Sequence, residues 1–319
     1  MSLDRAKAIA YARKHWTIPC DDGLLCLDNE VLSIEHKRRE LRAPAADGWE
    51  AKFVRYTDDT GALSEKAVFQ KDAEEKLIND WAGLADCAHF LSRCLQAGGV
   101  NVSQRGVHGL VMALQERSDT RTLCDRVGQE AAQRVIDTGI FKSGDMFGYF
   151  NVSPHGDYGE IRYTHSTMFA GKRNHHDPGR ITCHSMSRFP GLSDIEDRWF
   201  LKDGYTYTLI HFTSDDGAVG AATAREIGGW WKVTFGSEVL FYDVLPDGRA
   251  RMARARPKTA TSPLPEAAAI ASGHWFERAG VVTLIWRRSG TVEVWTRDPA
   301  TGGFTIQRNS HLTGHAAHL

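Results

Sequence analysis

The sequence predicts an α+β domain, in which helices come first and an antiparallel sheet follows, succeeded by an all-β domain of barrel or sandwich type. Apolar residues repeat at helical spacing in several segments before residue 138, whereas segments with strand character occupy 144–212. After residue 217 the chain turns to short strands and glycine turns, with five of the nine tryptophans. We therefore expect domains at 1–214, with an insertion near 20–70, and at 218–319.

The expected elements of the first domain follow from the same patterns. Helices are expected at 4–16, 72–85, 87–97, 105–117 and 121–138, and strands at 144–150, 160–171, 180–188 and 205–212.

The second domain contains two similar meanders, 229–249 and 273–291, each with two strands and a glycine turn, linked by the proline-rich stretch 257–265. This duplication predicts an up-and-down sheet that closes toward a small barrel or sandwich. Tryptophans on such strands fill the interior more often than they form a binding surface, so we expect them in the core.

The segment 87–97 has the pattern of a helix with a reactive cysteine at its N-terminus. Asp86 is a good N-cap whose carboxylate can accept backbone amide hydrogen bonds, and Gly98 and Gly99 supply a stop. Cys87 would then lie at the helix N-terminus, where partial positive charge and unpaired amides stabilise a thiolate and an oxyanion. The alternative is that Cys87 is an inert packing residue, which is the expected role of Cys94.

A thiolate nucleophile needs a base, and two downstream strands carry histidines. His165 would face Cys87 from one strand, and His184 on the next strand would orient the far ring nitrogen of His165. Asp145, in a Gly-Asp turn, is expected to make local backbone hydrogen bonds.

The order of these motifs carries a resemblance. Asp-Cys-x-x-Phe-Leu-Ser-x-Cys-Leu-x-Ala-Gly-Gly from Asp86, then Gly-Asp, then His165, then Cys-His-Ser at 183–185 resembles the putative amidase family of the papain-like superfamily, which includes NlpC/P60 and CHAP hydrolases. The segments 5–16 and 205–212 also resemble that family, so the resemblance covers 1–214 except the insertion. His89 departs from the family pattern, which has a small polar residue at that position.

The resemblance implies a papain-like fold with Cys87 as nucleophile, His165 as general base and His184 as third member. The backbone amide of Cys87 would help to hold the oxyanion, with Asp86 as local support. The implied function is a cysteine-dependent amide hydrolase, a peptidoglycan amidase or endopeptidase acting on stem peptides. As a hypothesis, it is an antibacterial effector exported by a dedicated secretion system, with a cognate immunity protein. Two alternatives stay open: a papain-like deamidase, transamidase or protease acting on a protein, and a non-catalytic binding protein using the Trp-rich domain.

The balance of charged residues limits the classes of partner that are expected. With 39 Lys and Arg against 40 Asp and Glu, neither nucleic acid nor a membrane surface is expected. No signal peptide or membrane span is evident, so we expect synthesis in the cytoplasm. Cys20 and Cys26 are expected as free thiols, with pairing left open. No cofactor is expected. The run His175-His176-Asp177 could suggest a metal site, but no third ligand lies at zinc spacing, so no metal is expected either.

Overall fold

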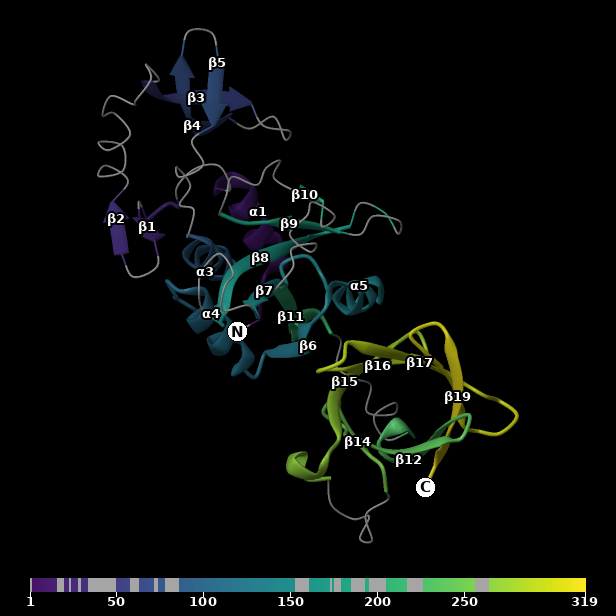
Figure 1. The fold of residues 1–319 in the computed structure, drawn as a ribbon. Coiled ribbons are helices and arrows are strands. Elements are labelled where there is room, and N and C mark those ends of the chain that lie inside the picture. Colours follow the sequence, from purple (N-terminus) through teal and green to yellow (C-terminus); the bar gives the residue numbers. More distant parts are fainter. Residues whose placement is uncertain are drawn as a thin grey trace. The chain divides into compact units, whose positions relative to one another are not determined.

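The computed structural model describes residues 2–15, 20–22, 24–27, 30–33, 50–57, 63–71, 74–77, 86–152, 161–172, 174, 179–184, 193–194, 205–216, 226–255 and 264–319. The chain divides into two compact units. The first comprises Met1–Thr120 and Lys142–Tyr205, and the second comprises Arg121–Phe141 and Thr206–Leu319 (Figure 1). Among the helices described, none combines the length and apolar character that a membrane span requires.

Three helices belong to the first unit: α1 (Arg5–His15), α3 (Cys87–Ala97) and α4 (Val107–Gln115). The prediction for 87–97 is confirmed at both ends. Gly99 adopts a left-handed φ of 86°, which ends the helix. Gly98 serves another purpose, since a Cβ there would lie 2.6 Å from Cδ1 of Leu3. The segment before α1 therefore passes directly over the C-terminal end of α3.

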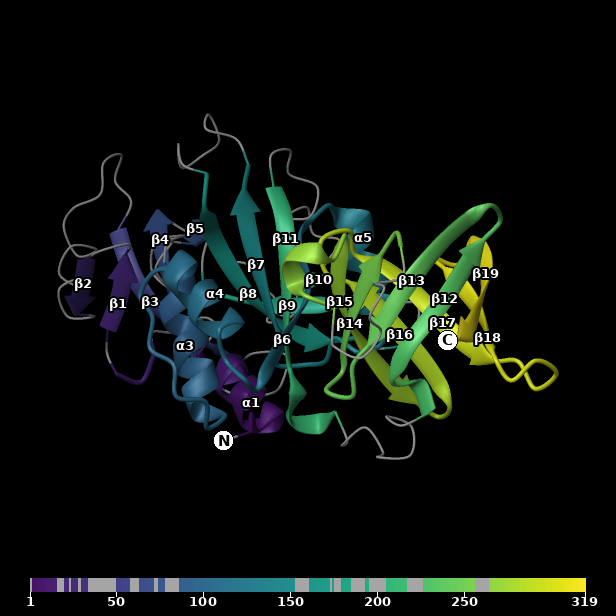
Figure 2. The ribbon, with the colours of Figure 1, turned by 90° about the horizontal axis from the view of Figure 1, so that it is seen from below.

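Four antiparallel strands of the first unit lie side by side in the order β10 (Ser193–Asp194), β9 (Arg180–Thr182), β8 (Tyr163–Gly171) and β7 (Met146–Asn151). Tyr149 pairs with His165, and a register shift follows immediately, so that Phe150 pairs with Tyr163. Both α3 and α4 contact β8 (Figures 1 and 2). The expected strands near 144–150, 160–171 and 180–188 are thus found, with shorter bounds.

The described residues of the predicted insertion from Leu24 onward form strands. Strands β1 (Leu24–Leu27) and β2 (Glu30–Ser33) form a hairpin, and β3 (Glu50–Thr57), β4 (Leu63–Lys71) and β5 (Glu74–Leu77) form a three-stranded antiparallel sheet. The helix expected at 72–85 is wrong where it can be checked, because 74–77 is a strand. The rest of that segment lies outside the described residues.

The second unit begins with β6 (Thr120–Val127), which lies next to β11 (Tyr205–Phe212). The short 3-10 helix Thr213–Asp215 follows β11. The helix expected at 121–138 is correct only in its second half, where α5 spans Gln129–Asp137. The hydroxyl of Thr208 donates to Oδ1 of Asp125 at 3.0 Å, which ties β11 to β6. Thr120, Thr122 and Val127 are β-branched and favour a strand, which outweighs the helical spacing of the apolar residues in 120–127.

Eight antiparallel strands form a closed barrel in the second unit: β12 (Gly229–Phe235), β13 (Glu238–Val244), β14 (Arg249–Ala253), β15 (Ala271–Arg278), β16 (Val281–Trp286), β17 (Thr291–Arg297), β18 (Phe304–Arg308) and β19 (Leu312–His318). A 3-10 helix at Glu266–Ala268 precedes β15. The barrel closes where Trp231 pairs with His318 and Thr234 with His315. Of the two architectures expected for this part, the structure has the barrel.

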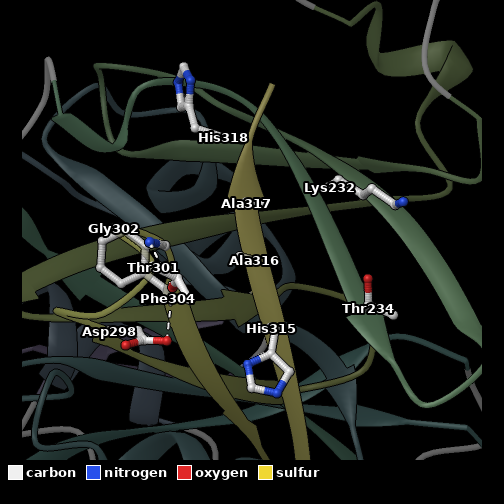
Figure 3. Close-up of a pocket in the computed structure, with 11 residues that line it drawn as sticks. Lys232, Thr234, Asp298, Thr301, Gly302, Phe304, His315, Ala316, Ala317 and His318 are labelled. Carbon is white, nitrogen blue, oxygen red and sulfur yellow. Dashed lines mark hydrogen bonds between the residues drawn. The ribbon is translucent and has the colours of Figure 1, made fainter.

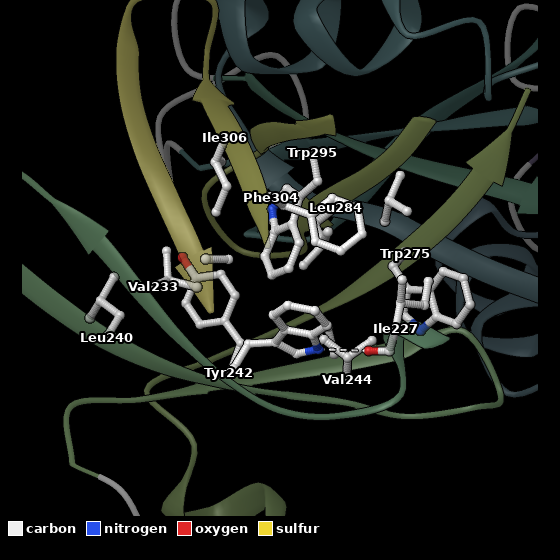
Figure 4. Close-up of a cluster of buried hydrophobic side chains, with 14 of the residues drawn as sticks. Ile227, Val233, Leu240, Tyr242, Val244, Trp275, Leu284, Trp295, Phe304 and Ile306 are labelled. Carbon is white, nitrogen blue, oxygen red and sulfur yellow. Dashed lines mark hydrogen bonds between the residues drawn. The ribbon is translucent and has the colours of Figure 1, made fainter. Parts of the chain in front are cut away.

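Aromatic and aliphatic side chains fill the barrel interior (Figure 4). The five tryptophans of this region are buried: Trp230, Trp231, Trp275, Trp286 and Trp295. Several indole N–H groups find acceptors, as where Trp275 donates to the carbonyl of Leu245 at 2.7 Å. These five tryptophans form core, as expected, so they do not themselves provide a stacking surface.

One charged group also lies inside the barrel. The carboxylate of Glu293 is fully buried, and its Oε1 accepts hydrogen bonds from the Tyr242 hydroxyl at 2.8 Å and from Nε of Arg308 at 3.0 Å. Its Oε2 accepts from the indole N–H of Trp295 at 3.3 Å. The buried charge is therefore both paired and hydrogen-bonded.

These elements correct the predicted fold class. The described residues form nineteen strands and four short α-helices, so the chain is mostly β. The expected α+β papain-like arrangement, with a layer of helices packed on an antiparallel sheet, is wrong. One reason is that strands form at 74–77 and 120–127, inside segments whose apolar spacing predicted helices. The other is that the insertion, for which no elements were predicted, contributes further strands.

Candidate active site

The carboxylate of Asp86 is the centre of a buried polar cluster in the first unit. The side chain is fully buried; its Oδ1 lies 2.9 Å from Nδ1 of His89, and its Oδ2 lies 3.1 Å from Nδ1 of His184. Asp86 occupies the N-cap position of α3 but makes no side-chain bond to the helix backbone. The predicted cap bond is therefore wrong, because the two imidazoles take both carboxylate oxygens.

His89, in the first turn of α3, is an imidazolium. Its Nδ1 bonds to Asp86, and its Nε2 lies 2.9 Å from Oδ2 of Asp22. Since carboxylates only accept, both ring nitrogens carry protons. Burial alone would lower the pKa of His89, but hydrogen bonds to Asp86 and Cys20 raise it to about 12. The ring thus joins α3 to the segment that follows α1.

His184, two residues beyond β9, is held on both sides. Its Nε2 donates to the carbonyl oxygen of His15 at 2.6 Å, and its ring stacks on Phe90 with centroids 4.0 Å apart. With Nδ1 on Asp86, both ring nitrogens are occupied. The expected role of His184 as the group that orients His165 is therefore not what its hydrogen bonds show.

Cys20 joins the cluster from the N-terminal segment. It is a buried free thiol, so it is not paired with Cys26. Burial raises the pKa of Cys20, while a hydrogen bond from His89 opposes that change. Its sulfur and ligand atoms of Asp86 and His184 all lie within 4.8 Å of one another. This donor set is the one in the described residues that is suited to a metal ion.

The predicted nucleophile and base lie on two elements in contact. Cys87 is the first residue of α3, His165 lies on β8, and α3 contacts β8. Cys87 is 2% exposed and His165 4% exposed. The His165 ring lies 5.0 Å from that of Tyr149, its cross-strand partner. Aromatic packing thus fixes one side of the His165 ring.

Asp145 has a structural role, as expected. Its Oδ2 accepts from the backbone amide of Lys142 at 2.7 Å, and its Oδ1 accepts from Nη1 of Arg5 at 2.7 Å. The carboxylate is fully buried, and it ties α1 to the turn that leads into β7. The turn bond is local and follows from sequence, whereas the ion pair to Arg5 does not.

A separate pocket of about 590 Å³ lies on the barrel, bordered by β12, β19 and the turn 298–303 (Figure 3). Lys232, Thr234 and His315 line it together with Asp298, which accepts a hydrogen bond from the hydroxyl of Thr301 at 2.8 Å. None of the predicted catalytic residues lines this pocket.

Sequence reasoning missed three members of the cluster: Cys20, Asp22 and His89. The spacing of Asp86 and His89, three residues apart on one helix face, was the available signal for His89. No local pattern marks Cys20 or Asp22, since their partners are distant in sequence. The residues His175, His176 and Asp177, considered for a metal, lie outside the described residues.

No family model, curated protein or solved structure matches this chain.

Proposed function

We propose that the chain is a cysteine-dependent amide hydrolase in which Cys87 is the nucleophile and His165 the general base. The observation that carries the proposal is the position of Cys87 as the first residue of α3, on a helix that contacts the strand bearing His165. A helix N-terminus favours negative charge, and a nearby imidazole is the usual base for a catalytic thiol.

The proposed reaction has two steps. His165 takes the proton of the Cys87 thiol, the thiolate attacks the amide carbonyl, and the amine leaves with that proton. Water then hydrolyses the thioester, with His165 as base. The backbone amide of Cys87 would donate to the oxyanion, as amides at a helix N-terminus are placed to do.

The substrate we propose is the stem peptide of peptidoglycan. This rests on the sequence resemblance around Asp86, Cys87, His165 and His184 rather than on the geometry. Secretion as an antibacterial effector, with an immunity protein to protect the producer, extends the same resemblance and is proposed on that ground alone.

The test is muropeptide release from purified sacculi by the wild type, Cys87→Ala, His165→Gln and Cys94→Ala. Cys94 is a matched control, because it is a fully buried cysteine on the same helix, two turns from its N-terminus. We expect release by the wild type and Cys94→Ala, and a loss of at least 100-fold in the other two. Equal release by wild type and Cys87→Ala refutes the proposal.

The second candidate is that Cys87 is a packing residue, which its exposed fraction of 2% favours. A thiol probe at neutral pH separates the two. A catalytic Cys87 is labelled in the folded wild type, and this labelling is absent from Cys87→Ala. A packing residue is labelled only after denaturation.

A further inference from the structure

We propose that Cys20, Asp86 and His184 form a zinc site in the first unit. The three residues come from three separate segments: the chain after α1, the N-cap of α3 and the chain after β9. All three side chains are buried, and their candidate ligand atoms lie within 4.8 Å of one another. Ligand atoms around tetrahedral zinc lie about 3.3–3.7 Å apart, so donor atoms within 4.8 Å of one another could reach one ion after shifts of about 1 Å.

The hydrogen bond of His184 to a main-chain carbonyl is the first supporting observation. A carbonyl oxygen can only accept, so the 2.6 Å contact between Nε2 and the oxygen of His15 requires the proton on Nε2. The other ring nitrogen, Nδ1, lies against Oδ2 of Asp86. Metal-binding histidines show this arrangement, with the second nitrogen donating to a carbonyl.

The contact between Nδ1 of His184 and Oδ2 of Asp86, at 3.1 Å, is the second observation. A carboxylate oxygen only accepts, so either a shared proton or a shared cation accounts for this separation, and the metal-binding test below distinguishes the two. A cation bound by both atoms would also take the nearby sulfur of Cys20 as a third ligand.

The donors select the ion. A thiolate, an imidazole nitrogen and one carboxylate oxygen suit zinc, whereas magnesium and calcium prefer oxygen alone. The other oxygen of Asp86, Oδ1, keeps its hydrogen bond to Nδ1 of His89. Hydrogen bonds of this kind orient a carboxylate that binds a metal.

The test measures metal binding in the full-length chain. The protein is stripped with a chelator, dialysed, and reconstituted with zinc chloride or cobalt chloride. We expect roughly one equivalent of zinc, a thiolate-to-cobalt charge-transfer band, and a rise in melting temperature on zinc addition. Cys20→Ser should lose the charge-transfer band, and His184→Gln should bind zinc at least 10-fold more weakly.

Two control variants distinguish the zinc site from the other cysteines and from the proposed catalytic residues. Cys124→Ser removes a buried cysteine of β6 in the second unit, and Cys87→Ala removes the proposed nucleophile. Both should keep the zinc and the cobalt band, so metal binding and hydrolysis can fail separately. If the wild type shows no thiolate-to-cobalt band, or Cys20→Ser keeps it, the proposal is overturned. The wild-type spectrum decides even if Cys20→Ser does not fold.

Discussion

Removing the guanidinium of Arg308 should destabilise the barrel by about 3 kcal/mol, because the buried carboxylate of Glu293 would lose its cation. Nε of Arg308 lies 3.0 Å from Oε1 of Glu293, and the Tyr242 hydroxyl donates to the same oxygen at 2.8 Å. The change Arg308→Met keeps the apolar stem of the side chain and deletes only its charge and donors.

The magnitude follows from burial. Breaking a buried ion pair by deleting one partner costs about 3–5 kcal/mol. The Arg308 side chain is 18% exposed, so water can partly replace the guanidinium. Tyr242 and Trp295 still donate to the carboxylate, which also limits the loss. These effects favour the lower end of the range.

The assay is urea unfolding followed by tryptophan fluorescence, which reports on the barrel because Trp231, Trp275 and Trp295 lie in its core. Arg308→Met, Glu293→Gln and the double variant form a cycle, and we expect a coupling energy of about 2 kcal/mol. Single effects that add to within about 0.5 kcal/mol would refute the reasoning.

An exposed ion pair supplies the control for this cycle. Arg297 pairs with Glu226, and their side chains are 55% and 39% exposed. Arg297→Met should therefore change the unfolding free energy by less than about 1 kcal/mol.

Three further changes test other parts of the structure. Burial and then neighbouring arginine charges lower the pKa of His274 from 6.5 to about 3, so the unfolded chain binds a proton that the folded chain does not. The free energy of unfolding should therefore fall as the pH drops from 6.5 toward 3, by up to about 1.4 kcal/mol per pH unit. His274→Gln should flatten this slope in urea unfolding at a series of pH values. An equal slope in both proteins would contradict the prediction. Asp145→Asn should lower the unfolding free energy by about 2–4 kcal/mol, because Arg5 loses its buried partner, and a change below about 1 kcal/mol in urea unfolding would show that the ion pair contributes little. Gly148→Val should cost about 1–3 kcal/mol, since its Cβ would lie 2.9 Å from Cγ2 of Val111, and Val111→Ala in the same chain should restore part of that loss; failure to recover would point to another cause.

The parts of the fold that were predictable depend on local signals. Helix α3 was predicted with the observed bounds because its N-cap residue, apolar face and Gly99 lie within one short segment. The barrel strands were visible through glycine turns and alternating side chains. The choice between barrel and sandwich depends on the pairing of Trp231 with His318, a distant contact that no local pattern encodes.

The predictions that were wrong or missing concern segments where local signals compete, and contacts between residues that are distant in sequence. In 120–127 apolar residues occur at a spacing that also fits a helix, and the strand formed instead. The bond between Asp86 and His184 joins residues 98 positions apart, so the cluster had no sequence signature. Cys87 and His165 were identified from motifs, and their roles stay predictions.

The closed barrel limits how the second unit can engage another protein. Each of its eight strands is hydrogen-bonded on both sides, since β12 pairs with both β13 and β19. An extended peptide therefore has no strand edge in this barrel on which to add itself, which rules out recognition by strand addition there. A partner of the barrel must instead contact side chains on its outer wall or the turns at its rims.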